Sequence, residues 1–383
     1  MIYLDNAATS WPKPDCVTEA IVRYLRDIGG SPGRSGHQLA NAAERLRLDA
    51  REALAELFGL ANPLRVVFTS GATAALNLVL RGLLGPGSHV VTSGIEHNAV
   101  MRPLRALETQ GVEVGIAACA PDGTLAPAAV AEQLRPQTRL IVVNHASNVC
   151  GTLLPIRAIG ALARERGIAF VVDAAQTAGC QPIDLEADNI DVLVFSGHKG
   201  LLGPTGVGGL AFSPRFDVGR LPAAVFGGTG SRSEDEHQPD FLPDKYEAGT
   251  PNIVGIAGLA ASVRYVLARG VSAIRAHEQR LTRRLLDGLG TIGQVRLFGP
   301  PTASARTAVV SFTLAGWSSS QLAQQLDERF GILCRPGLHC APRAHRTLGT
   351  FPDGTVRFAP GPFTTEAQID AAVAAVARLA HGQ

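Results

Sequence analysis

Between residues 64 and 212, short apolar runs alternate with segments of helical periodicity. The runs that are typical of strands lie at 65–70, 89–93, 112–118, 139–147, 168–175, 191–196 and 208–213. Several of them are apolar at nearly every position, as expected for a strand that is covered on both faces. Strands that alternate with helices predict an α/β fold, with a mostly parallel sheet and helices on both of its faces.

The rest of the chain follows a different pattern. Residues 39–59 predict a strongly amphipathic helix that ends at a glycine. Residues 226–252 are rich in Gly, Pro and acidic side chains, and they predict a long surface loop of functional importance. Two long helices within 253–289, followed by further strands and helices, predict a smaller α+β domain. We therefore expect a large domain over 15–252 and a small domain built from 1–14 and 253–383.

The composition excludes several classes of function. Lysine and arginine total 35 and aspartate and glutamate 33, so no basic surface is dense enough to indicate nucleic-acid binding. The first residues lack the pattern of a signal peptide, and no run of about twenty apolar residues predicts a membrane span. Six cysteines without a CxxC pair predict a reducing, cytoplasmic location, and ten histidines without an HExxH motif predict no metal site.

Polar residues follow several of the predicted strands, where open α/β sheets bind their ligands. Segment 68–77 runs from a strand through Gly71 into a helix, so the amides of Gly71, Ala72 and Thr73 would face outward at a helix N-terminus. Such amides bind anions, including phosphate groups. An ordinary turn with Thr73 as a cap fits the same residues, and the GKS or GKT of a P-loop is absent.

Asp173 directly follows an apolar strand, and Gln176 comes three residues later. A buried carboxylate is costly unless it is paired, and a protonated ring nitrogen of a ligand would pair with it. A helix N-cap is the alternative for Asp173. His97 and Asn148 also follow strands; Asn148 would hold a carboxylate or form a turn, and a lone histidine is more often a satisfied polar group than a catalyst.

The segment VFSGHKGLLGPTGVGG at 194–209 is the strongest signal, because it places Ser196, His198 and Lys199 at a strand end. The glycines that follow would permit close approach of a ligand to the backbone. Burial depresses the pKa of a lysine and supplies the free amine that forms a Schiff base, although a lysine that extends its charge to solvent fits as well. An anion site, a carboxylate for a ring nitrogen, a lysine and a histidine are together the parts that pyridoxal phosphate requires.

In the order and spacing of its motifs, the chain resembles the cysteine desulfurases of the selenocysteine lyase-like branch. These belong to the class V aminotransferase group of fold-type I pyridoxal-phosphate enzymes. The resemblance runs from YLDNAAT near the N-terminus to the final helix, through EHN, SNVCGT, DAAQ, SGHKGLLGPTG, EAGTPN and RPGLHCAP. It implies a seven-stranded sheet in the large domain, pyridoxal 5'-phosphate as the cofactor and a homodimer.

The resemblance also implies roles for the residues at the strand ends. Lys199 would bind the cofactor covalently and later move the substrate α-proton. Asp173 would keep the ring nitrogen protonated, His97 would stack on the ring and assist proton transfer, and Gln176 would hydrogen-bond the ring oxygen. The phosphate would be held by Gly71, Ala72, Thr73, Ser196, His198 and, from a second subunit, Thr250.

Cys340 is the residue whose interpretation the resemblance changes most. A cysteine in a stretch such as RPGLHCAP is most often buried and inert. In the family the matching thiolate attacks the sulfur of bound cysteine, alanine leaves, and a persulfide stays for a sulfur acceptor, for which we expect a docking protein. Neighbouring His339, Arg335 and Arg343 would favour the thiolate. Pro336 replaces the threonine of many relatives and would stiffen a short cysteine loop.

The substrate carboxylate would be clamped by Arg357, with Asn148 and Arg34 assisting. These roles describe an L-cysteine desulfurase that uses Cys340. A selenocysteine or cystine lyase on the same site is the alternative, and for selenium Cys340 would be dispensable. An aminotransferase with a structural Cys340 is disfavoured, because a thiol near the carboxylate clamp has no part in transamination.

Overall fold

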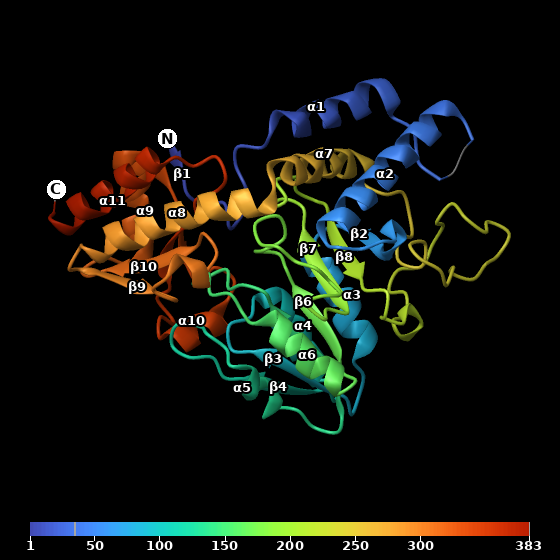
Figure 1. Cartoon of the computed structure of the whole chain (residues 1–383), viewed down its shortest axis with the longest axis horizontal. Coiled ribbons are helices and arrows are strands. Elements are labelled where there is room, and N and C mark those ends of the chain that lie inside the picture. The colour runs from blue at the N-terminus through green and yellow to red at the C-terminus, as the bar shows by residue number, and fades with distance from the viewer. Residues whose placement is uncertain (34–35, 383) are drawn as a thin grey trace.

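The computed structural model describes residues 1–33 and 36–382, so the predicted substrate-binding residue Arg34 lies outside the described residues. Its centre is a seven-stranded sheet in the order β2-β8-β7-β6-β5-β3-β4 (Figure 1). The strands are β2 (Val66–Thr69), β3 (His89–Ser93), β4 (Glu113–Ala117), β5 (Thr138–Asn144), β6 (Ala169–Asp173), β7 (Val192–Ser196) and β8 (Gly208–Phe212). Only β8 runs antiparallel to its neighbours, and every strand falls within or next to a predicted run, which confirms the α/β prediction.

Both faces of this sheet are apolar, because successive side chains of a strand point to opposite sides. In β6, Phe170 and Val172 pack on one face, whereas Ala169 and Val171 pack on the other. The first face is covered by α2 (Gln38–Leu57), α5 (Pro127–Ala131), α6 (Ile156–Glu165) and α7 (Ile253–Arg269). The second face is covered by α3 (Ala72–Leu83) and α4 (Asn98–Glu108). This double cover explains the continuous apolar runs.

A second core belongs to the C-terminal part of the chain. A four-stranded antiparallel sheet has the order β12-β13-β10-β9, and a short parallel pair joins β1 to β11. These strands are β1 (Ile2–Tyr3), β9 (Val295–Phe298), β10 (Val310–Leu314), β11 (Ile332–Leu333), β12 (Arg335–Gly337) and β13 (Thr355–Phe358). The helices are α8 (Val271–Gly290), α9 (Ser319–Phe330), α10 (Pro342–Leu348) and α11 (Glu366–Ala380). The N-terminus therefore lies against the C-terminal part of the chain (Figure 1).

The helix α7 connects these two cores. It packs against α1 (Asp15–Arg23) and α2, and its buried residues belong to the core of the large sheet. Packing changes at Gly270, after which Leu281 and Leu285 of α8 enter the second core. The change in packing thus comes one helix later than residue 252, where we predicted the boundary between the domains. The division into these two domains stays a prediction.

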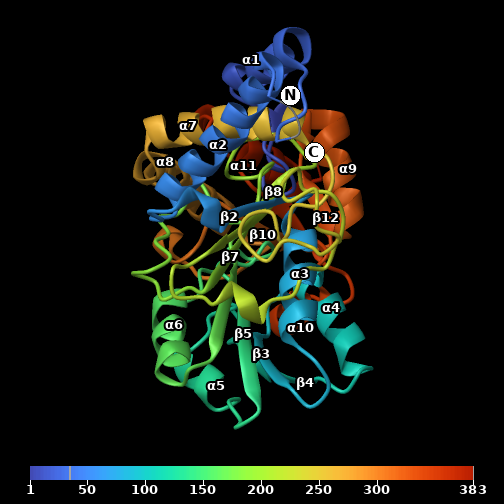
Figure 2. The same ribbon diagram turned by 90° about the vertical axis from the view of Figure 1, so that its right-hand side faces the viewer.

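The predicted loop at 226–252 is irregular over its whole length, and its tip extends from the edge of the sheet near β2 (Figure 1). Figure 2 shows β12 and α10 on the side of the molecule that also carries α3 and α4. Among the described residues, no single helix is long and apolar enough to cross a membrane; only the sharply bent pair of α7 and α8 passes that test, by length and composition alone.

Candidate active site

A cavity of about 230 Å³ opens where the carboxyl ends of β5, β6 and β7 meet the N-terminus of α3. Of the predicted residues, it is lined by Ala72, Thr73, His97, Asn148, Asp173, Gln176, Ser196, His198 and Lys199. Gly71 is the N-cap of α3 and precedes two of these residues. Parallel strands end at one edge of a sheet, so residues more than a hundred positions apart converge here.

Lys199 and Asp173 form the charged centre of the cavity. Burial lowers the pKa of Lys199 to about 8, although the nearby Asp173 carboxylate opposes this effect. Burial raises the pKa of Asp173, while the amide of Ala175, which donates to Oδ1 over 2.9 Å, favours its ionised form. The lysine is therefore unprotonated to about one tenth at pH 7 and to about one half at pH 8, which supplies the free amine that a nucleophile requires.

His97 stands at the N-terminus of α4, where its Nδ1 accepts the amide of Ala99 over 3.0 Å. Burial lowers its pKa to about 4, so the ring is neutral at physiological pH, with its proton on Nε2. The preceding residue, Glu96, is fully buried and was not predicted as part of the site. Its carboxyl accepts the amide of Asn144 at 3.0 and 3.1 Å, which joins the ends of β3 and β5, and burial raises its pKa to about 8.

The N-terminal segment contributes Ala8 to the lining of the cavity and is bonded to one backbone carbonyl at the site, that of His198. This oxygen accepts the amide of Ser10 at 2.9 Å and the Nζ of Lys13 at 3.1 Å. The Oγ1 of Thr9 also donates to it, at 3.2 Å. Burial lowers the pKa of His198 to about 4 and that of Lys13 to about 8. The only signal for Thr9, Ser10 and Lys13 was their place in and beside the YLDNAAT motif.

Arg357 lies in β13 and is fully buried beside the cavity. Its Nη1 donates to the carbonyl of Asn148 at 2.9 Å, and its Nη2 donates to Oδ1 of Asp5 at 2.6 Å. Its Nε and the Oδ1 of Asn148 are buried and have no hydrogen-bond partner. A buried polar group without a partner is costly, so this pair is prepared for a polar ligand. Sequence reasoning did not single out Asp5.

Cys340 is exposed and lines a groove of about 420 Å³ that shares Thr73 and His97 with the cavity. The Nη2 of Arg335 donates to its Sγ over 3.4 Å. The expectation that His339 supplies positive charge to the thiol is wrong. His339 is buried, and burial lowers its pKa to about 2, so its ring is neutral.

Three of the glycines after Lys199 have a different role from the one expected. A Cβ on Gly209 would lie 2.1 Å from the carbonyl oxygen of Val67, and one on Gly208 would lie 2.7 Å from that of Phe195. A Cβ on Gly200 would lie 2.5 Å from the carbonyl oxygen of Ala178. These glycines permit close packing of the protein backbone on itself rather than the approach of a ligand.

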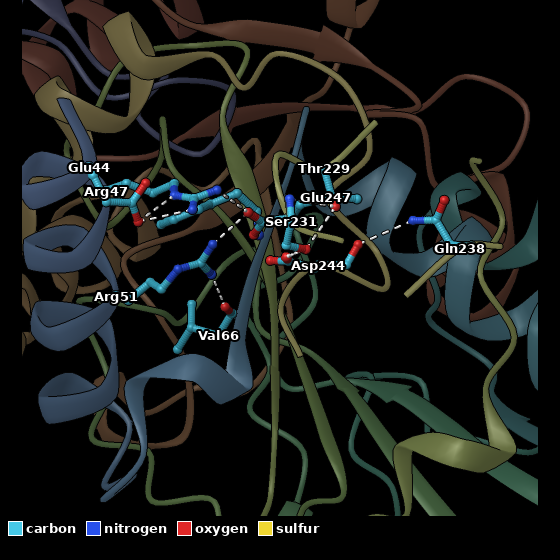
Figure 3. A network of polar contacts seen from close by, with 10 residues as sticks. Glu44, Arg47, Arg51, Val66, Thr229, Ser231, Gln238, Asp244 and Glu247 are labelled. Carbon is cyan, nitrogen blue, oxygen red and sulfur yellow. Dashed lines mark hydrogen bonds and ion pairs between the residues drawn. The ribbon is translucent and has the colours of Figure 1, made fainter. Parts of the chain in front are cut away.

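Thr250 is exposed and is not among the residues that line the cavity of its own chain. The loop that carries it is fixed by a network of polar contacts (Figure 3). Arg51 of α2 donates to the carbonyl of Val66 and pairs with Glu247, which in turn accepts the amide of Phe68 at 2.7 Å. Because β2 is an edge strand, these two side chains satisfy its free edge and hold the loop against it.

No cluster of three or more His, Cys, Asp or Glu side chains suited to a metal ion occurs in residues 1–33 and 36–382.

The model of the aminotransferase class-V family matches residues 2–372. A probable cysteine desulfurase of Methanothermobacter thermautotrophicus is 34% identical, over 93% of this chain and 89% of its own length. A cysteine desulfurase of Haloferax volcanii is 36% identical, over 91% of this chain and 83% of its own length.

Solved structures that are similar to this chain are also cysteine desulfurases. The apo structure of a cysteine desulfurase from Thermococcus onnurineus superposes with a TM-score of 0.94 and 32% identity, covering 100% of this chain and 95% of the other. A cysteine desulfurase of Escherichia coli, solved with an S-sulfonic acid, superposes with a TM-score of 0.88 and 29% identity, covering 98% and 94%. The similarity therefore extends over nearly the whole chain.

Proposed function

The chain belongs to the aminotransferase class-V family, and from this premise we propose that it is a cysteine desulfurase, which converts L-cysteine to L-alanine and retains the sulfur on Cys340. One observation carries the proposal. An exposed thiol, held by Arg335, lines a groove that shares Thr73 and His97 with the cavity, and that cavity contains a lysine whose pKa burial lowers to about 8. An aminotransferase needs the lysine but has no use for the thiol.

Pyridoxal 5'-phosphate fits the residues that line the cavity, and the members of this family are enzymes of that cofactor. When bound, it supplies an electron sink for the carbanion that forms at the substrate Cα. Lys199 would hold the cofactor, and Asp173 would face its ring nitrogen. The amides at the N-terminus of α3, together with Ser196 and His198, would hold its phosphate. His97, which is neutral at physiological pH, suits stacking on an aromatic ring.

The substrate would enter with its carboxylate toward Arg357. Asn148 would assist through the second hydrogen of its side-chain amide, since the first is donated to the carbonyl of His339. The unpartnered Nε of Arg357 supports this orientation, since a carboxylate would supply the hydrogen-bond acceptor that is missing there. Asp5 holds the guanidinium on its other side through Nη2. Lys199, once displaced from the cofactor, would take the α-proton and return it, because its lowered pKa allows it to act as a base.

Sulfur transfer would then proceed between two sulfur atoms. The Cys340 thiolate attacks the substrate sulfur, an S–S bond forms, and the bond from sulfur to Cβ breaks with its electron pair left on carbon. Cβ takes one proton, which completes the methyl group of alanine and balances the proton lost from the substrate thiol. The persulfide on Cys340 passes its outer sulfur to an acceptor. The exposure of Cys340 supports an acceptor that docks at this face.

A homodimer would bring Thr250 to the phosphate of the second copy. Near Thr250, a hollow of about 840 Å³ is lined by residues 222–225, which precede the 226–252 loop, by the C-terminal end of that loop and by α3. The large apolar side chains Val225 and Phe226 are exposed beside it, at 61% and 73%. Exposed apolar surface of this kind is typical of an interface between subunits. A monomer whose cofactor affinity is unaffected by Thr250→Ala would contradict this part of the proposal.

The direct test is mass spectrometry of the holoenzyme after exposure to L-cysteine without a reductant. We expect the tryptic peptide that contains Cys340 to gain the mass of one sulfur atom, and the other five cysteines to stay unmodified. Absence of the added sulfur, with a keto acid as product, would instead indicate transamination. Turnover of selenocysteine by a Cys340→Ala variant that has lost activity toward cysteine would show that the desulfurase and the lyase reactions both take place at this site.

A further inference from the structure

The cysteine loop has an unusual backbone for the residue types that form it. His339 has a φ of 50° and Cys340 a φ of 57°, so two successive residues other than glycine occupy the left-handed region. Side chains rarely adopt this conformation, and it persists only where surrounding contacts determine it. The loop therefore needs anchors, and the structure contains two kinds.

The first anchors hold the two carbonyls of this pair. The side-chain amide of Asn148 donates to the carbonyl of His339 at 2.7 Å, and the backbone amide of Asn98 donates to that of Cys340 at 2.9 Å. Both donors come from the large domain, next to the cavity. These two bonds fix the position of the loop relative to the cavity. They do not fix its position relative to β12, the strand that contains Arg335 and from which the loop begins.

The second anchor is a chain of side-chain contacts inside the small domain. The Nε2 of His339 contacts the carbonyl oxygen of Arg335 at 3.0 Å, and its Nδ1 contacts the Nε2 of His345 at 3.3 Å. The Nδ1 of His345 contacts the Oγ1 of Thr350 at 2.7 Å. All three side chains are buried, so none of these polar atoms exchanges its partner for water.

The donor and the acceptor of each of these contacts follow from one atom, the carbonyl oxygen of Arg335. A carbonyl oxygen only accepts, so the Nε2 of His339 carries its proton and donates to Arg335. Because the ring is neutral, its Nδ1 is then an acceptor, and His345 must donate to it from Nε2. The Nδ1 of His345 is in turn an acceptor, so the hydroxyl of Thr350 donates to it. Burial lowers the pKa values of His339 and His345 to about 2 and about 4, which keeps both rings neutral.

We propose that His345 and Thr350 are positioning residues for the nucleophile. They fix the tautomer and orientation of His339, whose bond to the Arg335 carbonyl closes the loop so that the Arg335 side chain and the Cys340 sulfur face each other. Neither residue touches the sulfur, and neither was predicted from the sequence. The inference rests on the proposed role of Cys340.

The test uses two substitutions of His345 that separate its two nitrogens. The amide nitrogen of His345→Gln lies where Nε2 lies and still donates to His339, whereas that of His345→Asn lies where Nδ1 lies and leaves His339 without a donor. We expect kcat of the holoenzyme to fall by about tenfold in His345→Asn, the equivalent of one hydrogen bond, and by clearly less in His345→Gln. The KM for L-cysteine should change little in either variant.

A second measurement, which does not require turnover of substrate, accompanies the kinetic measurements. Amide hydrogen exchange of the apoprotein should rise in residues 335–342 of His345→Asn, less so in His345→Gln, and stay unchanged elsewhere. His277→Asn, at a partly buried histidine of α8 that also contacts a carbonyl, is the matched control and should affect neither measurement. If His345→Asn does not fold, Thr350→Val should give a smaller effect in the same direction, and Thr350→Ser should restore it.

Equal effects of the two His345 variants, or wild-type kinetics and exchange in His345→Asn, would overturn the inference. That outcome leaves the proposed function intact as long as Cys340→Ala is inactive. Full activity of Cys340→Ala would contradict the proposed function itself, and the hydrogen-exchange result would still report whether His345 orders the loop.

Discussion

The guanidinium of Arg335 lies against the sulfur of Cys340, with Nη2 donating to Sγ over 3.4 Å. A fixed cation beside a sulfur stabilises the negative charge that a nucleophilic thiol carries. We expect Arg335→Ala to lower kcat, and the rate of Cys340 alkylation by iodoacetamide in the apoprotein, by about tenfold, in line with one charge-assisted hydrogen bond. Arg335→Lys should lose less. The exposed Arg346→Ala is the control in α10, and equal alkylation rates in all four proteins would contradict this prediction.

Lys199 should be the lysine that binds the cofactor. The chain has three lysines, Lys13, Lys199 and Lys245, and burial lowers the pKa of both Lys13 and Lys199 to about 8. Only Lys199 is among the residues that line the main cavity. Borohydride reduction of the holoenzyme followed by peptide mass mapping should place the cofactor on Lys199. Label on Lys13, or retention of the yellow colour by Lys199→Ala after dialysis, would show that the amine is assigned wrongly.

Glu96 should make stability depend on pH. Burial raises its pKa from 4.5 to about 8, so the native state binds a proton that the unfolded state has lost between these values. Its contribution is therefore favourable at low pH and is lost as the pH rises from about 4.5 to about 8. We expect Glu96→Gln to gain stability over the wild type across this interval, by up to a few kcal/mol, since each pKa unit corresponds to about 1.4 kcal/mol.

Thermal unfolding of the apoprotein at a series of pH values between 5 and 9 measures this difference. The exposed Glu52→Gln serves as the control and should follow the wild type throughout. A constant offset between Glu96→Gln and the wild type at all pH values would show that Glu96 is ionised in the folded protein.

The buried Arg51–Glu247 pair should stabilise the fold more than exposed ion pairs do. The two side chains are 2% and 5% exposed and bind the free edge of β2. Arg51→Met removes the nearer cation from the buried Glu247 carboxylate, which among the described residues keeps only Arg47 at 3.5 Å, and it takes the donor away from the carbonyl of Val66. This variant should therefore lower the free energy of unfolding by about 2 kcal/mol. Arg264→Met removes the exposed pairs with Asp49 and Glu56 and should cost about 1 kcal/mol or less. Urea unfolding that ranks these two variants equally would contradict the prediction.

The sequence predicted the seven-stranded sheet well, because its strands are apolar on both faces and the helices around it are amphipathic. The two- and three-residue strands β1, β11 and β12 were not predicted, since so few residues show no periodicity. Their pairing depends on partners far along the chain, such as Ile332 for Ile2. The exact place at which the packing changes, Gly270, was also not visible, because the sequence predicts both helices without showing which sheet each of them packs against.

The site residues likewise divide into those that the sequence predicted and those that it could not predict. Lys199, Asp173 and His97 could be predicted because each follows a strand, and strand ends converge. Asp5 could not, because its partner Arg357 is 352 positions away and only the folded chain brings them together. The charge on His339 was misjudged because burial decides it, and the sequence does not show that the ring is enclosed. The homodimer, the role of Thr250 and the cytoplasmic location remain predictions.

The central claim is that Cys340 takes sulfur from L-cysteine. The most direct measurement supplies holoenzyme with L-cysteine and a reductant, and quantifies alanine and sulfide for the wild type and for Cys340→Ala. We predict equimolar alanine and sulfide from the wild type. Cys340→Ala should retain the cofactor on Lys199 but form neither product above background. Undiminished production of alanine and sulfide by Cys340→Ala would contradict the account.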